Sequence, residues 1–431
     1  MADFDVIVVG AGIAGSTAAY KLASEGREAL LIDRASEPGS KNLSGGIFYG
    51  RTLPDLIPGF YENAPIERKI VRNVVMFTRG EDALSIDYAN YGFAGTDSRP
   101  PNGFSVLRAK FDSWLAEQAE EVGASVVPGI CVESLIVEDG VCKGIVAGGE
   151  EMSADCVVVA DGINSKLAEF LGQRQGFDIH DMGVGVKYLY KLDEPIINDR
   201  FHCKSGEGVA YGIMGDVSDK IPGGGFLYTN RDSISVGLVV HIDHLAEAGK
   251  TPYDVLDHMV SNPAVAELLK GAELAEYGAH MVAEGGKRNL SEHLSGNGWL
   301  IAGDAAGFAA NNGFTVRGMD FAAQSGLLAA EAILQAKGDY SEVSLSKYRQ
   351  LVEESFVGKD MDAYAQAPRF MKDERVYDEL TEMVCSLFEG LYTQDGTPKK
   401  NMLPLLTEAM KASGLGLMQL GGIGMKAVRS L

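Results

Sequence analysis

The sequence predicts an α/β protein in three parts: a domain built on a parallel sheet, a smaller domain built on an antiparallel sheet, and a C-terminal helical region. A glycine-rich turn joins a β-branched run to a helical stretch within residues 4–25. Two later buried strands end in small-residue turns that carry an aspartate, and four strand-like runs follow one another over residues 182–242. A length of 431 residues suits two or three domains.

Composition and charge narrow the classes of function. The chain has 38 Lys and Arg against 60 Asp and Glu, a formal charge of −22, and binding nucleic acid needs a basic face instead. The N-terminus has no signal-peptide pattern and no window is apolar enough to span a membrane, so we expect a cytoplasmic protein. The cysteines form no CxxC pair, which argues against a zinc or four-cysteine iron–sulfur site; each is expected to be a small buried hydrophobe: Cys131, Cys142, Cys156, Cys203 and Cys385.

The N-terminal motif predicts a Rossmann dinucleotide site. Residues 4–9 form a strand, a GxGxxG turn follows, and a helix begins within it. The next strand ends in Asp33, where a carboxylate can hold the ribose hydroxyls. Gly10 allows the tight turn, Gly12 lets the backbone approach a diphosphate, and Gly15 lets the helix pack on the strand. Ile13 and Ala14 lie in the first helical turn, whose N–H groups would face the phosphates. The alternative is an ordinary turn between a strand and a helix.

Two later motifs indicate that the dinucleotide is FAD. A buried strand ends at Ala160-Asp161-Gly162, and another ends at Gly303-Asp304, where Asp304 could hold a ribityl or ribose hydroxyl. A helix over residues 318–337 would point its positive end at the flavin pyrimidine ring and stabilise the anionic reduced flavin. Taken alone, Asp304 could instead be a helix N-cap.

Further candidates complete a discontinuous flavin site. Arg108, at the start of a helix that runs to residue 122, could clamp the diphosphate, the alternative being a surface arginine. Cys131 and Val132 would lie near the adenine. The arrangement is similar to that of glutathione-reductase-type and p-hydroxybenzoate-hydroxylase-like flavoproteins, but no cysteine pair stands near residue 45. The remaining candidate cofactor contacts are Arg34, Lys41, Gly313, Arg317, Gly318 and Met319.

The predicted domains interleave along the chain. An antiparallel sheet from strands at residues 182–192, 209–214, 225–228 and 233–242 would roof the flavin, and short helices follow at 253–260 and 264–270. We assign residues 1–75, 103–175 and 287–340 to the FAD domain, 76–102 and 176–286 to the sheet domain, and 341–431 to the helical region.

Several motifs in order give the chain a closer resemblance. Together they resemble the electron-transfer-flavoprotein:quinone oxidoreductases, and within that group the FixC proteins, over about residues 1–380. The C-terminal four-cysteine iron–sulfur domain of the mitochondrial enzymes is absent, as it is in FixC proteins. The motifs are Lys41-Asn42-Leu43-Ser44-Gly45-Gly46, residues 223–228 (GGGFLY), residues 235–240 (SVGLVV), Glu284-Gly285-Gly286 and residues 326–333 (GLLAAEAI).

The resemblance implies a function. Electrons would come from an electron transfer flavoprotein pair through a separate ferredoxin-like, FixX-like iron–sulfur subunit and leave to a quinone, within an electron-bifurcating complex. By similarity, the backbone of Gly223 and Gly224 would bind a quinone carbonyl, and Ser44, Gly45 and Gly46 would lie at the flavin ring edge. The alternatives are a flexible hairpin start for the first pair and a simple turn for the second group.

The last 34 residues form a basic, Met- and Leu-rich tail, with five basic side chains against one acidic. It could lie on an anionic membrane at the inner face of the cell membrane or dock a partner subunit; we favour a helical layer packed on the flavin domain with its charges solvated. Gly421, Gly422 and Gly424 should weaken a continuous helix there. The histidines, including His241 and His244, suggest no metal site and are expected at the surface or hydrogen-bonded.

Two rival functions remain open at this stage. One is a stand-alone reductase or hydroxylase of a small apolar substrate that uses NAD(P)H; the other is a partner-binding subunit with a vestigial flavin. No acid–base catalytic residue is assigned, because solvent can supply the protons that a quinone needs.

Overall fold

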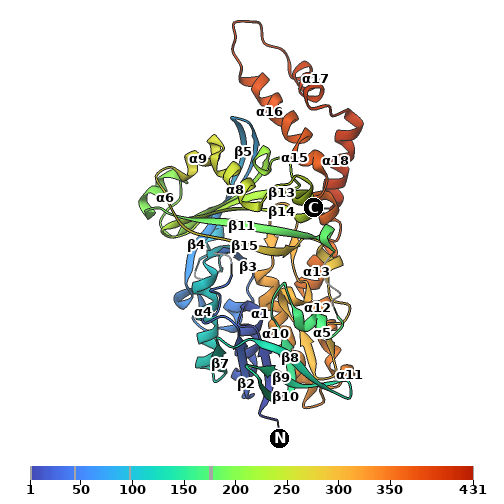
Figure 1. The fold of residues 1–431 in the computed structure, drawn as a ribbon. Helices are drawn as coiled ribbons and strands as arrows, with labels where there is room; N and C mark the ends of the chain where they lie inside the picture. The colour runs from blue at the N-terminus through green and yellow to red at the C-terminus, as the bar shows by residue number, and fades with distance from the viewer. Residues whose placement is uncertain (1, 43–44, 97–98, 174–177, 431) are drawn as a thin grey trace.

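The computed structural model describes residues 2–42, 45–96, 99–173 and 178–430, and the N-terminus and the C-terminal helices lie at opposite ends of the molecule (Figure 1). The first sheet has the order β16-β17-β10-β1-β2-β7, and its strands from β17 to β7 are parallel. A β8–β9 hairpin extends β10 as an antiparallel meander. The strands are β1 (Phe4–Val9), β2 (Ala29–Asp33), β7 (Ser125–Pro128), β8 (Val132–Glu138), β9 (Val141–Ala147), β10 (Glu150–Val159), β16 (Ser295–Gly296) and β17 (Trp299–Ile301).

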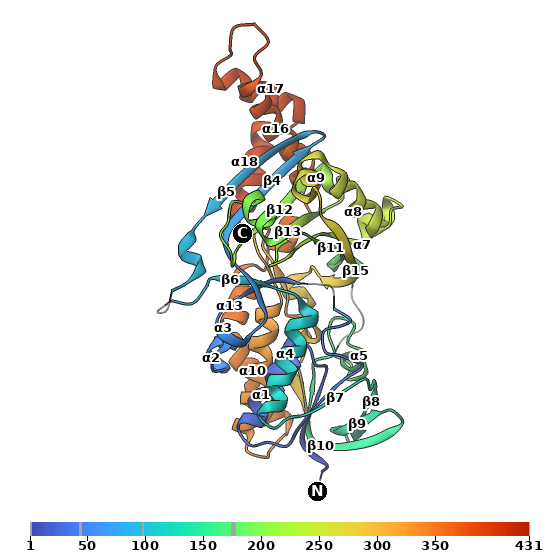
Figure 2. The ribbon, with the colours of Figure 1, turned by 90° about the vertical axis from the view of Figure 1, so that its left-hand side faces the viewer.

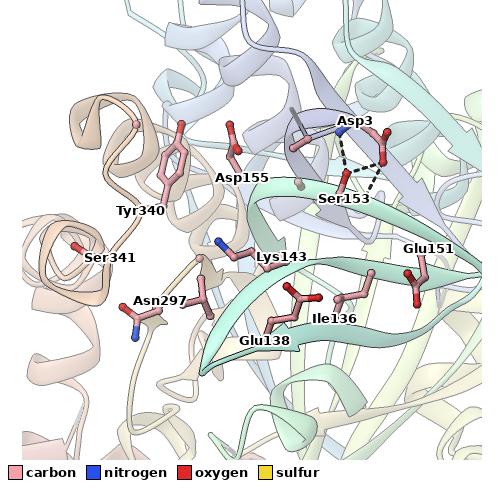
Figure 3. A pocket seen from close by; sticks show the side chains of 15 residues that line it. Asp3, Ile136, Glu138, Lys143, Glu151, Ser153, Asp155, Asn297, Tyr340 and Ser341 are labelled. Atoms are coloured by element: carbon pink, nitrogen blue, oxygen red, sulfur yellow. Dashed lines mark hydrogen bonds between the residues drawn. The ribbon is translucent and has the colours of Figure 1, made fainter.

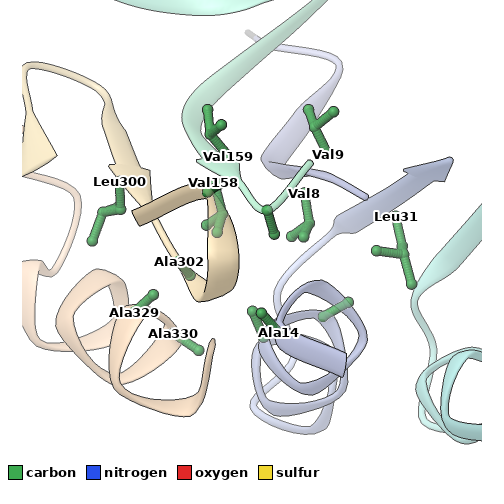
Figure 4. Close-up of a cluster of buried hydrophobic side chains, with 14 of the residues drawn as sticks. Val8, Val9, Ala14, Leu31, Val158, Val159, Leu300, Ala302, Ala329 and Ala330 are labelled. Atoms are coloured by element: carbon green, nitrogen blue, oxygen red, sulfur yellow. The ribbon is translucent and has the colours of Figure 1, made fainter. Parts of the chain in front are cut away.

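The core of this first unit lies between the sheet and its helices. Strand residues such as Val8, Val158 and Leu300 are fully buried, and small side chains such as Ala14 and Ala329 let two helices approach them (Figure 4). Because parallel strands are covered on both faces, their sequences are nearly continuous apolar runs. The helices here are α1 (Ile13–Ser24), α4 (Arg108–Glu121), α5 (Lys166–Phe170), α10 (Met319–Ala336), α11 (Glu342–Leu345), α12 (Lys347–Glu354) and α13 (Phe356–Ala363).

The second sheet has the order β15-β11-β14-β13-β12-β4-β6-β3, with β5 paired to β4. One face is apolar and packs on helices α8 (Pro252–Ser261) and α9 (Pro263–Leu269). All pairs are antiparallel except β12 with β4, which runs parallel. The strands are β3 (Gly46–Tyr49), β4 (Ile66–Arg79), β5 (Asp82–Ala89), β6 (Gly103–Val106), β11 (Met182–Lys191), β12 (Glu207–Gly215), β13 (Gly223–Thr229), β14 (Ser233–His241) and β15 (Glu273–Ala283).

The predicted α/β fold class is confirmed, with two differences in the second sheet. The four strands expected between residues 182 and 242 are β11 to β14. The sheet also takes up β3, β4 and β6, from residues 46–79 and 103–106, so it is larger than the sequence predicted and has one parallel pair. Those segments pair across long sequence separations, which local patterns do not reveal. The domain boundaries themselves stay a prediction.

The C-terminal helices form a small unit of their own (Figure 2). Val376, Met383 and Ile423 lie in its core, and α16 contacts β4, β5 and β12 of the second sheet. The tail helices α17 and α18 pack on α16 and α14, so the expectation that the tail packs on the flavin domain is wrong. Helix α18 also continues through Gly421, Gly422 and Gly424, because it buries Ile423 against its neighbours. The helices are α14 (Ala367–Met371), α15 (Glu374–Tyr377), α16 (Glu379–Tyr392), α17 (Met402–Ser413) and α18 (Leu417–Ser430). Within the described ranges, no helix combines the length and the apolar character needed to cross a membrane.

Candidate functional site

The glycine turn after β1 forms a cradle at the N-terminus of α1. Gly10 has φ +104°, and a Cβ there would lie 2.3 Å from the carbonyl oxygen of Ala160. A Cβ on Gly15 would lie 1.9 Å from the carbonyl oxygen of Gly10, so the turn folds back on its own helix. Among the described residues, no side chain caps the first turn, which also holds no acid. The free N–H groups and the helix dipole therefore suit a diphosphate, and the residues present fit FAD at this point.

Asp33 closes the cradle from the end of β2. Its carboxylate accepts hydrogen bonds from the backbone N–H groups of Ala11 and Ala35, each at 2.7 Å. The carboxylate thus lies beside the glycine turn, where the sequence predicted an acid for ribose. Ile13 and Ala14 are buried in the first turn of α1 and serve its packing.

Arg108 reaches the same cradle from the start of α4. Its Nη2 lies 3.8 Å from where a Cβ of Gly12 would be, and Asp304 is close enough to influence its pKa. Two hydrogen bonds, of 2.6 and 2.7 Å, join the guanidinium to Asp112, whose side chain has no exposed surface. The arginine is therefore held between a buried carboxylate and the glycine turn, a position that suits a clamp on a diphosphate rather than a free surface side chain.

The second acidic turn and α10 approach the cradle from the other side. Gly303 has φ +64°, and a Cβ there would lie 2.9 Å from Cβ of Ala14. Gly318 is the N-cap of α10, and the Met319 side chain reaches β3, with Cε 3.0 Å from where a Cβ of Gly46 would be. Asp304 and the N-terminus of α10 thus flank one continuous surface that begins at the glycine turn.

The other predicted contacts are less uniform. Ser44 lies outside the described residues. Lys41 donates to the carbonyl of Arg34 at 3.4 Å, and Gly313 accommodates a turn at φ +79°. The Arg317 side chain pairs with Asp320 and Asp360 and stacks on Phe321, so ion pairs already occupy its guanidinium. Ala160, Asp161 and Gly162 follow β10 beside Gly10, and Val132 begins β8; Cys131, expected to be buried, is exposed, and Cys203 is half-buried.

One face of the second sheet is lined by glycines. Gly183, Gly185 and Lys187 alternate along β11, and their partners in β14 are His241, Val239 and Gly237. Gly224 and Phe226 of β13 pair with Val239 and Gly237, and Gly212 of β12 pairs with Phe226. Directly paired residues lie on one face, opposite the face covered by α8 and α9. We call this surface the glycine face, defined by Gly183, Gly185, Gly212, Gly224 and Gly237.

Lys187 joins the glycine face to the cofactor side. Its Nζ donates to the carbonyl of Gly45 and lies 5.3 Å from the centroid of the Phe226 ring. Burial, and secondarily the charge of Arg108, lowers the pKa of Lys187 to about 7. The lysine was missed because its signal, a glycine at every second position and then a lysine on one strand face, has meaning only once the strand register is known.

Gly223 and Gly224 are the first residues of β13, where the sheet narrows because this strand pairs with β14 but not yet with β12. They pair with Val240 and Val239 of β14, while pairing with β12 begins at Gly225. The buried Tyr377 donates its hydroxyl proton to the carbonyl of Met371 at 2.8 Å, and the backbone of Gly223 lies close enough to that hydroxyl to affect its pKa. A Cβ on Gly224 would meet only the carbonyl oxygen of Ile213, at 3.5 Å, so the glycine face is open here.

Two buried ionisable groups border the same face. His241 is 3% exposed, and its Nδ1 has no hydrogen-bond partner among the described residues, so the expectation of a surface or hydrogen-bonded histidine is wrong. Glu284, directly after β15, is 8% exposed and accepts a hydrogen bond from Asn311 at 3.4 Å. The sequence flagged Glu284 only as part of a glycine motif, because its burial depends on contacts distant in the chain.

A surface hollow of about 820 Å³ lies elsewhere, between the start of β1 and the β8–β9 hairpin (Figure 3). Its wall includes Asp3, which is hydrogen-bonded to Ser153, together with Lys143 and Tyr340. None of the predicted site residues lines it. It is at the amino edge of the parallel strands, whereas ligands of such sheets bind at the carboxyl edge.

Comparison with known families agrees with this geometry. The FAD dependent oxidoreductase family matches residues 5–91, the ubiquinone-binding part of ETF-QO matches residues 182–282, and the ETF-QO/FixC family C-terminal domain matches residues 367–431. Over 422 residues the chain is 43% identical to Protein FixC of Salmonella typhi, with 97% of each chain covered.

The chain belongs to the FixC family. It is also 41% identical over 414 residues to the probable electron transfer flavoprotein-quinone oxidoreductase YdiS of Escherichia coli K12, with 96% of each chain covered. A crystal structure of a geranylgeranyl bacteriochlorophyll reductase-like protein from Thermoplasma acidophilum shares the fold, with a TM-score of 0.71 at 21% identity over 97% of this chain and 99% of that one. This FixC-family chain is a flavoprotein oxidoreductase, and FAD is its cofactor.

Proposed function

We propose that the chain passes electrons from an electron transfer flavoprotein, through a ferredoxin-like iron–sulfur partner, to a quinone, as the FixC-type subunit of an electron-bifurcating complex. Its FixC-family membership and the match of residues 182–282 to the ETF-QO ubiquinone-binding part support this. The structural observation that carries it is that the glycine face meets the cofactor side directly, through Lys187 and Gly45. A flat acceptor on that face would lie next to the flavin ring, excluded from water.

The chain's own residues then hold the cofactor in place. Gly10, Gly12 and Gly15 admit the diphosphate, Arg108 neutralises it, and Asp33 and Asp304 hold sugar and ribityl hydroxyls. Gly45, Gly46 and Met319 lie at the edge where the ring belongs. Bound FAD supplies a ring that accepts and releases electrons, and the protein fixes the distance to the acceptor.

The quinone would bind where the sheet narrows at Gly223 and Gly224. Because Gly224 has no side chain, a flat ring can approach its backbone, and Val239 offers an apolar contact from the neighbouring strand. The closeness of Tyr377 to Gly223 ties the C-terminal helices to this part of the sheet.

The C-terminal helices would make the contact with a partner subunit or a membrane surface. Leu403, Leu417 and Met418 are 73%, 74% and 93% exposed on a segment with a basic excess. Exposed apolar side chains next to lysines suit either an anionic lipid surface or an acidic protein. We place the protein in the cytoplasm, peripherally at the inner face of the cell membrane.

The decisive experiment uses the purified FAD-loaded protein, reduced with dithionite and mixed without oxygen with a short-chain quinone. We expect rapid reoxidation of the flavin by the quinone and no rapid flavin reduction by NADH or NADPH. Native co-purification should bring an electron transfer flavoprotein pair and a ferredoxin-like chain. Filling the face with Gly224→Leu should slow reoxidation by the quinone at least tenfold, while a small one-electron acceptor still reacts.

The opposite pattern would favour the stand-alone reductase or hydroxylase. Fast flavin reduction by NADPH in the protein alone, with no reaction toward the quinone, contradicts the proposal. A colourless protein that takes up no FAD would support the reading of a vestigial subunit.

A further inference from the structure

Glu284 connects the glycine face to the cofactor loop. Its Cγ and a methyl carbon of Val239 each lie 3.0 Å from where a Cβ of Gly183 would be, so its side chain lies across the open floor of the face. Its hydrogen-bond donor, Asn311, lies in the short strand β18 (Ala310–Asn311), between Asp304 and α10. Val239 is the direct partner of Gly224. Gly183, which Glu284 contacts, therefore lies two strand spacings across the sheet, roughly 9.6 Å, and two residues along the strand, roughly 6.8 Å, from Gly224. An acceptor that reaches Glu284 must extend across the glycine face from Gly224.

The charged groups around Glu284 come from every neighbouring element. Lys372, the residue that follows α14, lowers the pKa values of both Glu284 and His241 and is itself paired with Asp181 at 3.3 Å. Arg288 also pairs with Asp181, and the charge of Glu284 contributes to raising the pKa of Tyr377 of α15. Burial raises the pKa of Glu284 to about 7, against the opposing hydrogen bond from Asn311 and the charge of Lys372.

His241 extends the polar edge toward solvent. It is the strand partner of Gly183, which places its side chain on the same face as Glu284. Its ring centroid is 6.2 Å from that of His244, which is partly exposed and bonded to Asp243. His241 is thus a buried imidazole with an unpartnered Nδ1 beside the more exposed imidazole of His244. Packing alone does not require such an arrangement.

We propose that Glu284 is the proton-transfer residue for the acceptor bound on the glycine face, and that His241 and His244 connect it to solvent. The inference rests on the proposed reduction of a quinone. A quinone that becomes a hydroquinone gains two electrons and two protons. When an anionic reduced flavin is reoxidised, the quinone receives both electrons and one proton, so one proton remains to be supplied. The O–H bond of Glu284 breaks, an O–H bond forms at the quinone oxygen, and the carboxylate is reprotonated from solvent.

The test compares Glu284→Gln with wild type in the FAD-loaded, dithionite-reduced protein. The amide keeps the size of the side chain, so flavin absorbance should be retained and the melting temperature should not fall. With a short-chain quinone, we expect reoxidation to slow about 100-fold, as when a general acid is lost. With a ferrocenium salt, which takes one electron and no proton, the rate should be unchanged. Wild-type quinone reduction should fall above pH 7, and the variant should lose that pH dependence.

A matched control and a second readout keep the test decisive. Glu276→Gln changes an exposed glutamate on β15, the strand that Glu284 directly follows, and should behave as wild type. Infrared difference spectra of the wild type should show a protonated-carboxyl band that titrates near pH 7 and is missing in Glu284→Gln. A wild type that does not reduce any quinone overturns the proposed function and this inference together. A wild type that reduces quinone, with a variant of equal rate and pH profile or without the infrared band, overturns the inference alone.

Discussion

The two sheets of this FixC-family protein build their sites in different ways. In the parallel sheet, the carboxyl-terminal halves of β1 and β10 and all of β17 are apolar and buried, and the chemistry lies in the turns that follow them. In the second sheet the chemistry lies on a strand face, where glycines from β11, β12, β13 and β14 come together by register. The first site is a set of local motifs on a rigid core, and the second is a surface that exists only after the strands have paired.

This difference predicts which substitutions should disrupt folding and which should alter the binding of a substrate. A change at Gly10 or Gly15 of the glycine turn places a Cβ within 2.3 Å of a backbone carbonyl oxygen, and the packed strands and helices leave that backbone little room to move. At Gly212 and Gly224 of the glycine face, an added Cβ would meet no atom closer than 3.5 Å, so a change there should alter substrate fit more than folding. The predictions below test this contrast, beginning with the largest expected effect.

Gly15→Val should abolish FAD binding and strongly destabilise the fold. A Cβ at this position would lie 1.9 Å from the carbonyl oxygen of Gly10, and neither backbone segment can shift without opening the core. Flavin absorbance after purification and the melting temperature measure the effect. The control is Gly421→Ala, in an exposed part of α18 with no atom within 4 Å, which should stabilise by about 0.5–1 kcal/mol. A yellow, stable Gly15→Val protein would refute the cradle.

Arg108→Ala should lower the free energy of unfolding by about 3 kcal/mol and weaken FAD binding. It leaves the Asp112 carboxylate, which has no exposed surface, with a hydrogen bond from Asn42 as its remaining side-chain partner. Urea unfolding and flavin titration measure the two effects. The Arg51–Asp55 pair has the same i,i+4 spacing but is exposed, so Arg51→Ala should change stability by less than about 0.5 kcal/mol. Equal effects of the two substitutions would contradict the prediction.

Lys187 and Glu284 predict opposite pH effects on stability. The folded pKa of Lys187 is about 7, below its ordinary 10.5, so its buried charge costs stability below pH 7 and that cost disappears as the pH rises toward 10.5. The folded pKa of Glu284 is about 7, above its ordinary 4.5, so its stability cost appears as the pH rises from 4.5 through 7.

Neutral substitutions should remove each cost in its own pH range. Lys187→Met should stabilise by about 1–3 kcal/mol at pH 6 and lose that gain at high pH, while Glu284→Gln should stabilise by a similar amount at pH 8 and not at pH 4.5. Urea unfolding of the flavin-free proteins at several pH values gives both curves. If the two substitutions changed the free energy of unfolding with the same dependence on pH, the two groups would not be buried as charges on this face.

The sequence predicted the parts of the site that are local. The turn around Gly10, Asp33 at the end of its strand, the turn at Asp304 and the start of α10 each follow from a short stretch with a definite order of strand, glycine and helix. The family could also be recognised from such motifs. The placement of β3, β4 and β6 could not be predicted, because their partners lie far away in the chain and no turn residue signals the pairing.

The sequence by itself thus determined the fold class, the FixC family and FAD as the cofactor, because each glycine turn and buried strand is formed by consecutive residues. The tertiary structure alone decided the glycine face, the burial of Lys187, His241 and Glu284, and the packing of the tail on α14 and α16. The physical reason is that burial, and with it a shifted pKa, depends on which distant side chains exclude water from a group. That arrangement is set by strand register and helix packing.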